Sequence, residues 1–247
     1  MDLTTRLRTQ ITSQHLPCPS SSLLTSLTTT RSPPPPLPSL VATAKARLLA
    51  CDLTTSDLID ASQLSPFPAE ILNASNAKEA TLAQDVCVQI LDLENLSLSR
   101  WEQIEELEAI ERGERTRGRQ VIRVTGDGDD RDGHGDASAA SSRPPPAGSG
   151  RNATHRLVLQ DWKGARVYAV ELKKMEGIGI ATTNIGCKMV VRAGTVIARG
   201  TVLLSPENCM LLGGKIDAWH DAWVVSRMAR LKEAVGAGAD GRSSTSR

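Results

Sequence analysis

The residues best suited by type and spacing to catalysis are the glutamates between positions 102 and 114. Two neighbouring carboxylates can divide general acid and general base roles when their pKa values are driven apart. These glutamates, however, alternate with arginines in a segment of helical periodicity, which is typical of a solvated helix face. They are Glu102, Glu105, Glu106, Glu108, Glu111 and Glu114. We therefore predict no catalytic residue, and no enzyme.

Other patterns that could hold a metal or a cofactor fail on spacing. Residues 127–138 have the composition of a calcium loop, but Ser138 stands where the bidentate Glu is required. Gly177-Ile178-Gly179 lacks the third glycine of a dinucleotide loop. The cysteines form no CxxC pair and are expected to be reduced and mostly buried; they are Cys18, Cys51, Cys87, Cys187 and Cys209. The sequence predicts neither a metal nor a cofactor.

Charge and aromatic content argue against a dedicated nucleic-acid or membrane protein. The formal net charge is +1, so no global field draws the chain to a polyanion. Four Trp, one Tyr and one Phe are few rings for stacking single-stranded bases. No apolar run reaches the length of a membrane span. The first fifty residues are poor in acids, as transit peptides are, but they also have helical patterns, which we favour.

Residues 1–62 have the pattern of three short helices. Leu3, Leu7 and Ile11 share one face at a spacing of four. The run Pro33–Pro36 interrupts the chain, and Pro38 fits the first turn of a third helix. The other apolar positions are Leu23, Leu24, Leu27, Leu40, Val41, Ala44 and Leu48. Helices with one apolar face must pack together, so we expect a helical bundle.

Residues 63–235 have the pattern of a small closed β-barrel. Short apolar strands are expected at 85–93, 157–172 (a hairpin), 188–192 and 201–204, followed by a helix at 216–235. The fold class is therefore α+β: a three-helix bundle, a five-stranded OB-like barrel with a long insertion between its first two strands, and a C-terminal helix. A disordered tail is expected at 236–247.

The insertion at 95–153 is the most unusual feature of the chain. Its first part, from Trp101 to Glu111, has helical spacing. The later part is rich in Gly, Asp, Ser, Ala and Pro, and cannot bury enough surface to order itself. A connection of about sixty residues is far longer than an ordinary loop, and such loops are usually functional or disordered.

A segment near the C-terminus resembles a known family. Residues 199–214 read RGTVLLSPENCMLLGG. They are similar to the signature of the RecQ-mediated genome instability protein 1 family, at Arg199, Gly200, Pro206, Glu207, Asn208, Leu212, Gly213 and Gly214. Residues 48–53 resemble the end of that family's helical domain, although its Trp is replaced. The short chain is similar to the fungal-type form.

The resemblance implies a non-catalytic scaffold in the nucleus. Members of the family bind topoisomerase III and help a RecQ-family helicase to dissolve double Holliday junctions. An insertion between the first two barrel strands reaches into the topoisomerase gate, and residues 95–153 lie at that position. Any DNA binding by the chain itself is expected to be weak.

The insertion helix supplies the candidate partner-binding residues. Aromatic, apolar and arginine side chains are typical of protein-binding hot spots. The candidates are Trp101, Ile104, Leu107, Ile110, Arg115, Arg117 and Arg119. Alternatively, the apolar ones fold back onto the barrel. A second reading of the whole chain is a single-strand-binding OB module, in which only Trp162 and Tyr168 of the barrel could stack bases.

Overall fold

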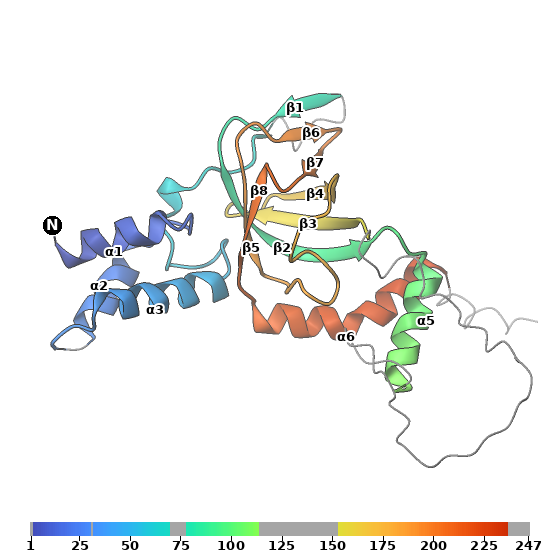
Figure 1. Ribbon diagram of the computed structural model, residues 1–247, viewed down its shortest axis with the longest axis horizontal. Helices are drawn as coiled ribbons and strands as arrows, with labels where there is room; N and C mark the ends of the chain where they lie inside the picture. The colour runs from blue at the N-terminus through green and yellow to red at the C-terminus, as the bar shows by residue number, and fades with distance from the viewer. Residues whose placement is uncertain (1, 31, 70–77, 114–152, 237–247) are drawn as a thin grey trace, which may run out of the picture. The chain divides into compact units, whose positions relative to one another are not determined.

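The computed structural model describes residues 2–30, 32–69, 78–113 and 153–236 (Figure 1). It divides into two compact units, which are described separately. The first takes in Met1–Leu96 and Ala153–Arg227, and the second is described over 97–113 and 228–236. The predicted tail from 237 onwards and most of the insertion lie outside the described residues.

Three helices form the N-terminal bundle, as predicted. They are α1 (Leu3–Thr12), α2 (Ser21–Thr29) and α3 (Leu37–Ala50). The Asp2 carboxylate accepts from Leu3 N at the start of α1, and the Ser20 hydroxyl accepts from Leu23 N at the start of α2. Such N-caps satisfy donors that a helix start leaves free. The bundle core consists mainly of leucines: Leu7, Leu16, Leu23, Leu24, Leu27, Leu40, Leu48 and Leu53, with Ile11 and Ala44.

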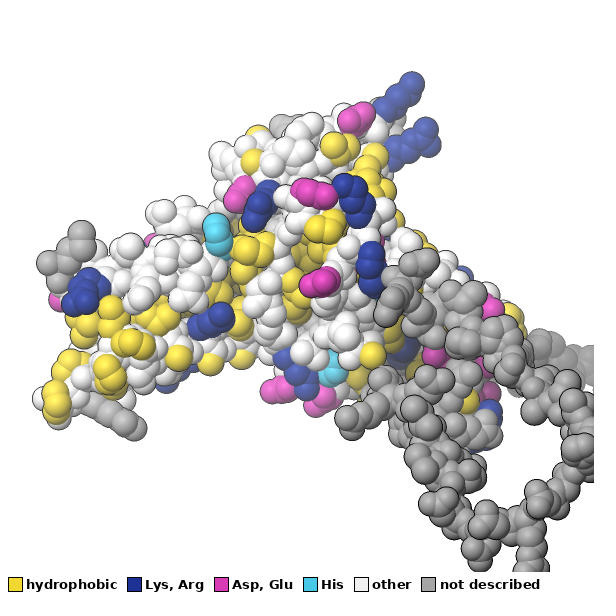
Figure 2. Space-filling view, in the orientation of Figure 1, with side chains coloured by type: hydrophobic (Ala, Val, Ile, Leu, Met, Phe, Trp, Pro, Cys, Tyr) yellow, Lys and Arg dark blue, Asp and Glu magenta, His cyan; other side chains and the backbone are white. Residues whose placement is uncertain are grey.

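One face of the bundle carries few charges. In the space-filling view, the face over α1, α2 and α3 is mostly hydrophobic or uncharged, with a few Lys or Arg side chains (Figures 1 and 2). A short 3-10 helix, Ala61–Gln63, follows the bundle. Phe67 then enters the barrel core, and its N–H donates to Asp161 Oδ2 at 2.8 Å.

A single curled sheet forms the second half of the first unit. Its strands are β1 (Glu79–Thr81), β2 (Val86–Asn95), β3 (His155–Asp161), β4 (Arg166–Glu171), β5 (Lys188–Val191), β6 (Val196–Ala198), β7 (Thr201–Leu204) and β8 (Cys209–Gly213). Their order is β1-β6-β7-β4-β3-β2-β5-β8. Only the β4–β7 pair among them is parallel.

The strand count differs from the prediction of five strands in a closed barrel. The eight described strands curl into a half-barrel, with β1 and β8 at the two ends of the sheet. β1 and β6 are three residues long, too short for the alternation of side chains to show in a sequence. The α+β fold class with its C-terminal helix is nevertheless confirmed.

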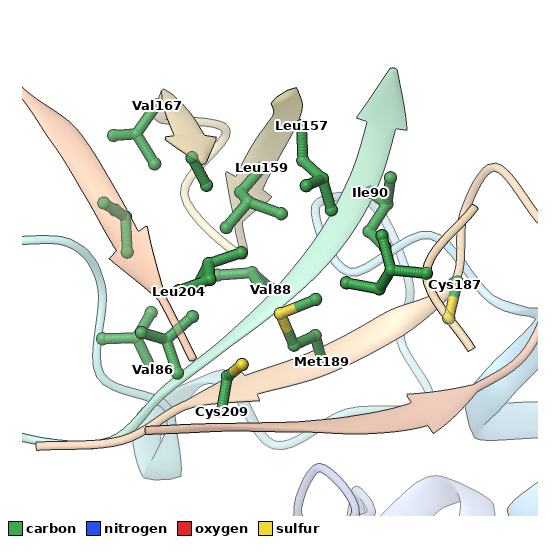
Figure 3. Close-up of a cluster of buried hydrophobic side chains, with 14 of the residues drawn as sticks. Val86, Val88, Ile90, Leu157, Leu159, Val167, Cys187, Met189, Leu204 and Cys209 are labelled. Carbon is green, nitrogen blue, oxygen red and sulfur yellow. The ribbon is translucent and has the colours of Figure 1, made fainter. Parts of the chain in front are cut away.

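The inner face of the sheet carries the core. Val86, Val88 and Ile90 of β2 pack against Leu157 and Leu159 of β3 and against the neighbouring strands (Figure 3). The sulfur atoms of Met189, Cys187 and Cys209 lie in the same cluster. All five cysteines are free, and three of them are buried.

Helix α6 (Asp217–Ala234) is anchored to the sheet at a bulge in β2. The register of β2 against β3 shifts between Ile90 and Asp92, so that Leu91 is the extra residue. Asp92 Oδ1 accepts from the indole Nε1 of Trp223 at 2.5 Å, and Trp223 is buried against the core. No helix in the described part of the chain is long and apolar enough to cross a membrane.

Candidate partner-binding site

The two ends of the insertion are fixed side by side on the sheet. Asn95, the last residue of β2, pairs with His155, the first residue of β3. Leu96 N donates to Thr154 O at 2.9 Å, one step further out. Both members of the Asn95–His155 pair are buried, so the first and last residues of the insertion start from fixed positions on the barrel.

A buried carboxylate secures the returning end. Glu171 Oε2 accepts from His155 N at 2.9 Å and lies 2.6 Å from His155 Nδ1. Its other oxygen accepts from Met175 N at 3.2 Å. A buried polar group is costly unless hydrogen bonds satisfy it, and the Glu171 carboxyl group has three polar contacts. The start of β3 is thereby tied to the end of β4.

Helix α5 (Arg100–Glu111) is the described element of the insertion. A capping box begins it: Glu102 N donates to Ser99 Oγ, and Ser99 N donates to Glu102 Oε2. In the same unit, the Glu108 carboxylate lies 2.8 Å from Lys232 Nζ in the last turns of α6. The hydrogen bond from Lys232 holds the pKa of the half-buried Glu108 below its ordinary value.

The structure separates the predicted anchor residues. Trp101 is 55% exposed, whereas Ile104 is 3% exposed, so Trp101 is accessible to a partner and Ile104 is covered. Gln103 is buried beside Ile104 and donates to Leu98 O, which places the covered face of α5 at these two residues. Leu107 and Ile110 are half-buried. Arg115, Arg117 and Arg119 lie outside the described residues.

A polar network joins the bundle to the barrel. Gln89 of β2 is fully buried; its Oε1 accepts from Leu53 N at 3.0 Å, and its Nε2 donates to Asp52 Oδ1 at 2.7 Å. The same Nε2 donates to Gln160 Oε1 at 3.0 Å. Burial raises the pKa of Asp52, but its hydrogen bonds with Gln89 and Thr54 outweigh that effect and lower it.

Lys188 of β5 is the second element of this joint, and sequence reasoning missed it. Its side chain is fully buried, and Nζ donates to Gly186 O at 2.6 Å and to Leu49 O at 3.4 Å. The Leu49 carbonyl belongs to the last turn of α3, where a cationic donor is favourable. Burial lowers the pKa of Lys188, and Cys51, Cys87 and Cys187 lie around it. Lysine is almost never fully buried, so no signal in the sequence marked it.

The family-like signature shapes two turns and the joint. Arg199 and Gly200 have φ values of 48° and 75° between Ala198 and Thr201, which pair across the β6–β7 hairpin. Asn208 closes the β7–β8 turn: its Oδ1 accepts from Ser205 N and its Nδ2 donates to Leu203 O, both at 2.8 Å.

The glycine end of the signature meets the bundle. Gly214 has φ of 99°, and a Cβ built there would lie 2.3 Å from Leu49 O. Leu212 packs half-buried against the bundle core, and Gly213 also has positive φ. Pro206 and Glu207 stand in the exposed turn, where Glu207 pairs with Lys173 at 2.8 Å. The signature residues therefore shape the β6–β7 and β7–β8 turns and the contact between the barrel and the bundle.

Comparison with known proteins decides the family. Residues 67–227 match the model of the RMI1 N-terminal OB-fold domain, and residues 11–56 match that of the RMI1 N-terminal helical domain. The chain belongs to the RecQ-mediated genome instability protein 1 (RMI1) family. This confirms the resemblance inferred from residues 199–214. RMI1 proteins are non-catalytic structural subunits, which agrees with the prediction that the chain is not an enzyme.

A curated relative shows how far the likeness extends. The chain is 28% identical over 156 residues to RecQ-mediated genome instability protein 1 of Schizosaccharomyces pombe. The match covers 62% of this chain and 66% of the relative, a little under two thirds of its length. The range that matches the OB-fold domain contains Gln89 and Lys188, the residues that join the barrel to the bundle.

Proposed function

We propose that this chain is a scaffold subunit that binds topoisomerase III and a RecQ-family helicase, and that it promotes the dissolution of double Holliday junctions in the nucleus. The name of the relative links that protein to RecQ and to genome stability. The observation that carries the proposal is the insertion between β2 and β3, held by the buried Asn95–His155 pair and presenting the exposed Trp101.

The proposed mechanism is a bias on the topoisomerase gate. A bound segment can shift an equilibrium only by binding one state better than the other. The fixed ends of the insertion make such a preference possible. Because the Asn95–His155 pair holds both ends on the sheet, a movement of the bound insertion is coupled to the barrel. The helicase would bind elsewhere on the bundle or the barrel.

The first test is co-purification with topoisomerase III of the same organism. We expect a stoichiometric complex that Trp101→Ala weakens by about thirtyfold, the effect of losing one aromatic hot spot. Val225→Ala is the matched control, since Val225 is 82% exposed on α6. Ile104 is left intact, because truncation of this buried residue would disturb α5 itself. Absence of a complex at micromolar concentration would contradict the proposal.

A deletion tests the gate mechanism separately. Removal of residues 97–150 joins Leu96 to Arg151, next to the pair that already closes the hairpin at Thr154. We expect a folded barrel that no longer stimulates decatenation by topoisomerase III. Stimulation equal to that of the full chain would exclude the insertion as the active element.

The single-strand-binding alternative has little support from the barrel. Trp162, one of its two candidate stacking rings, packs against the bundle core, and its indole N–H is buried without an acceptor among the described residues. Tyr168 remains exposed. One ring gives little stacking energy, so we expect direct DNA binding to be weak.

A further inference from the structure

The outer face of β4 carries a row of exposed side chains. Arg166, Tyr168 and Val170 alternate with inward-facing residues along the strand, and Leu172 continues the row directly after it. Tyr168 is 53% exposed and Leu172 is 63% exposed. A strand that shows an aromatic and an aliphatic side chain on its solvent face departs from the usual polar alternation.

Neighbouring strands extend this row into a patch. Across β3, Val158 pairs with Tyr168, and across β7, Leu203 pairs with Val170. Both of these side chains are half-buried. The β4 patch is defined here by its apolar members: Val158, Tyr168, Val170, Leu172 and Leu203. Four of these residues lie on three adjacent strands of the first unit, and Leu172 follows β4 directly, where its N–H donates to Leu204 O at 2.8 Å.

Charges at the two ends of the β4 patch differ. Near one end, Arg156 pairs with Glu94 and places its guanidinium 5.1 Å from the Tyr168 ring centroid. At the other end, Tyr168 of β4 and Thr201 of β7 lie opposite each other in the parallel β4–β7 pair. Arg166 lies two residues before Tyr168, and Arg199 lies two residues before Thr201. Both arginines are exposed, and neither has an ion pair within the described part of the chain. This end of the patch therefore carries two exposed positive charges, and Glu79 of β1 pairs with Ala198, the residue before Arg199.

We propose that the β4 patch binds an acidic segment of a partner protein. Apolar side chains of that segment lie on Tyr168 and Leu172, and its carboxylates reach Arg166 and Arg199. Tyrosine and arginine are enriched at the energetic centres of protein interfaces. The guanidinium group matches a carboxylate with two parallel hydrogen bonds.

The composition of the patch selects this occupant over two others. Single-stranded nucleic acid is held by several stacking rings, whereas the β4 patch has one ring among aliphatic side chains. A second copy of the chain would present the same face, on which Glu94, a carboxylate beside the patch, is already paired with Arg156. The patch and the insertion share no residue, so the inference holds whether or not topoisomerase III is the partner.

Selection of short random peptides displayed on phage, against the full chain, tests the inference. We expect enriched peptides that combine Asp or Glu with aliphatic or aromatic residues. Synthetic versions of the enriched peptides should bind to the variants Tyr168→Ser and Leu172→Ser about tenfold more weakly than to the parent chain. This corresponds to a loss of about 1.4 kcal/mol in binding free energy. Val225→Ser should bind them as the parent chain does. A charge-reversed chain, Arg166→Glu with Arg199→Glu, should lose the acidic peptides.

Each other outcome overturns the inference. Enriched peptides without acidic residues, or peptides that the Tyr168 and Leu172 variants bind equally well, would exclude the β4 patch as an acidic-segment site. Binding of an oligothymidine that depends on Tyr168 and weakens steeply with salt would assign the patch to nucleic acid. Self-association that Leu172→Ser abolishes would assign it to a second copy. Because both residues are exposed, matching thermal unfolding of the variants is expected.

Discussion

Gln89 and Leu53 are joined by a hydrogen bond of 3.0 Å between the side-chain oxygen of the first and the backbone N–H of the second. The bond connects the first long strand of the barrel to the segment that leaves the bundle. Gln89 is fully buried and makes further bonds to Asp52 and Gln160. The two domains are thus held by specific polar contacts as well as by apolar packing.

Replacement of this glutamine should weaken the whole first unit. In Gln89→Ala, the buried Leu53 N–H loses its acceptor, which should lower the free energy of unfolding by about 1–3 kcal/mol. Gln10→Ala, at an exposed position of α1, should change it by less than about 0.5 kcal/mol. Urea unfolding of the three proteins measures both values. Equal stabilities would show that the network contributes nothing.

Two glycines distinguish backbone strain from a steric clash at the joint. Gly214 and Gly194 both have positive φ, at 99° and 86°. Alanine at either should cost about 1–2 kcal/mol for the left-handed conformation. Only at Gly214 does the new Cβ meet Leu49 O, so Gly214→Ala should lose clearly more stability than Gly194→Ala, which has open space. Denaturant unfolding compares them; equal losses would contradict the close approach of bundle and barrel.

Lys188 should make the stability depend on alkaline pH. Its pKa in the folded chain lies below the ordinary value of 10.5 because of burial. Between the two values the Lys188 side chain binds more proton in the unfolded chain, so its contribution to stability rises with pH through that interval. The buried thiols oppose this rise in both proteins, because their raised pKa values make stability fall as the pH passes the ordinary thiol value. Lys188→Met removes only the lysine contribution, together with the bond to Leu49 O, so the difference in unfolding free energy between parent and variant should rise from neutral pH towards pH 10.5, and a difference independent of pH would contradict the shift.

The buried thiols should resist alkylation in the folded chain. Burial raises the pKa of Cys87 to about 12, and those of Cys187 and Cys209 to about 11. Since the thiolate is the reactive form, iodoacetamide at neutral pH should modify the half-buried Cys18 and Cys51 first. Mass spectrometry of time points locates each adduct. Modification of Cys87 as fast as that of Cys18 would contradict the buried joint.

Periodicity predicted the regular parts of this fold, because it reflects burial on one face. The leucine spacing of α1 and α2 and the alternation in β2 and β4 were sufficient to place them. Ile104 and Trp101 could not be separated in this way, since residues three apart on a helix read as one face. Trp162 was named as one of two barrel rings that could stack bases, yet it packs on the bundle, which is distant in sequence.

The signature residues show a different limit. Resemblance identified the family from Arg199 to Gly214, but it gave no reason for each residue. The structure supplies these reasons: positive φ at Gly200, side-chain closure of a turn by Asn208, and close approach to Leu49 at Gly214. Such roles depend on contacts between segments, which a single sequence does not display.

The adjacency of Asn95 and His155 has an evolutionary consequence. Paired residues of an antiparallel ladder lie about 5 Å apart, so the chain between them leaves and returns at almost one point. The barrel thus sets no length for what it carries there, and doubling such a loop costs only about 0.6 kcal/mol in closure entropy. This geometry allows the segment to be lengthened, shortened or rewritten in evolution without altering the strand pairing of the sheet that supports it.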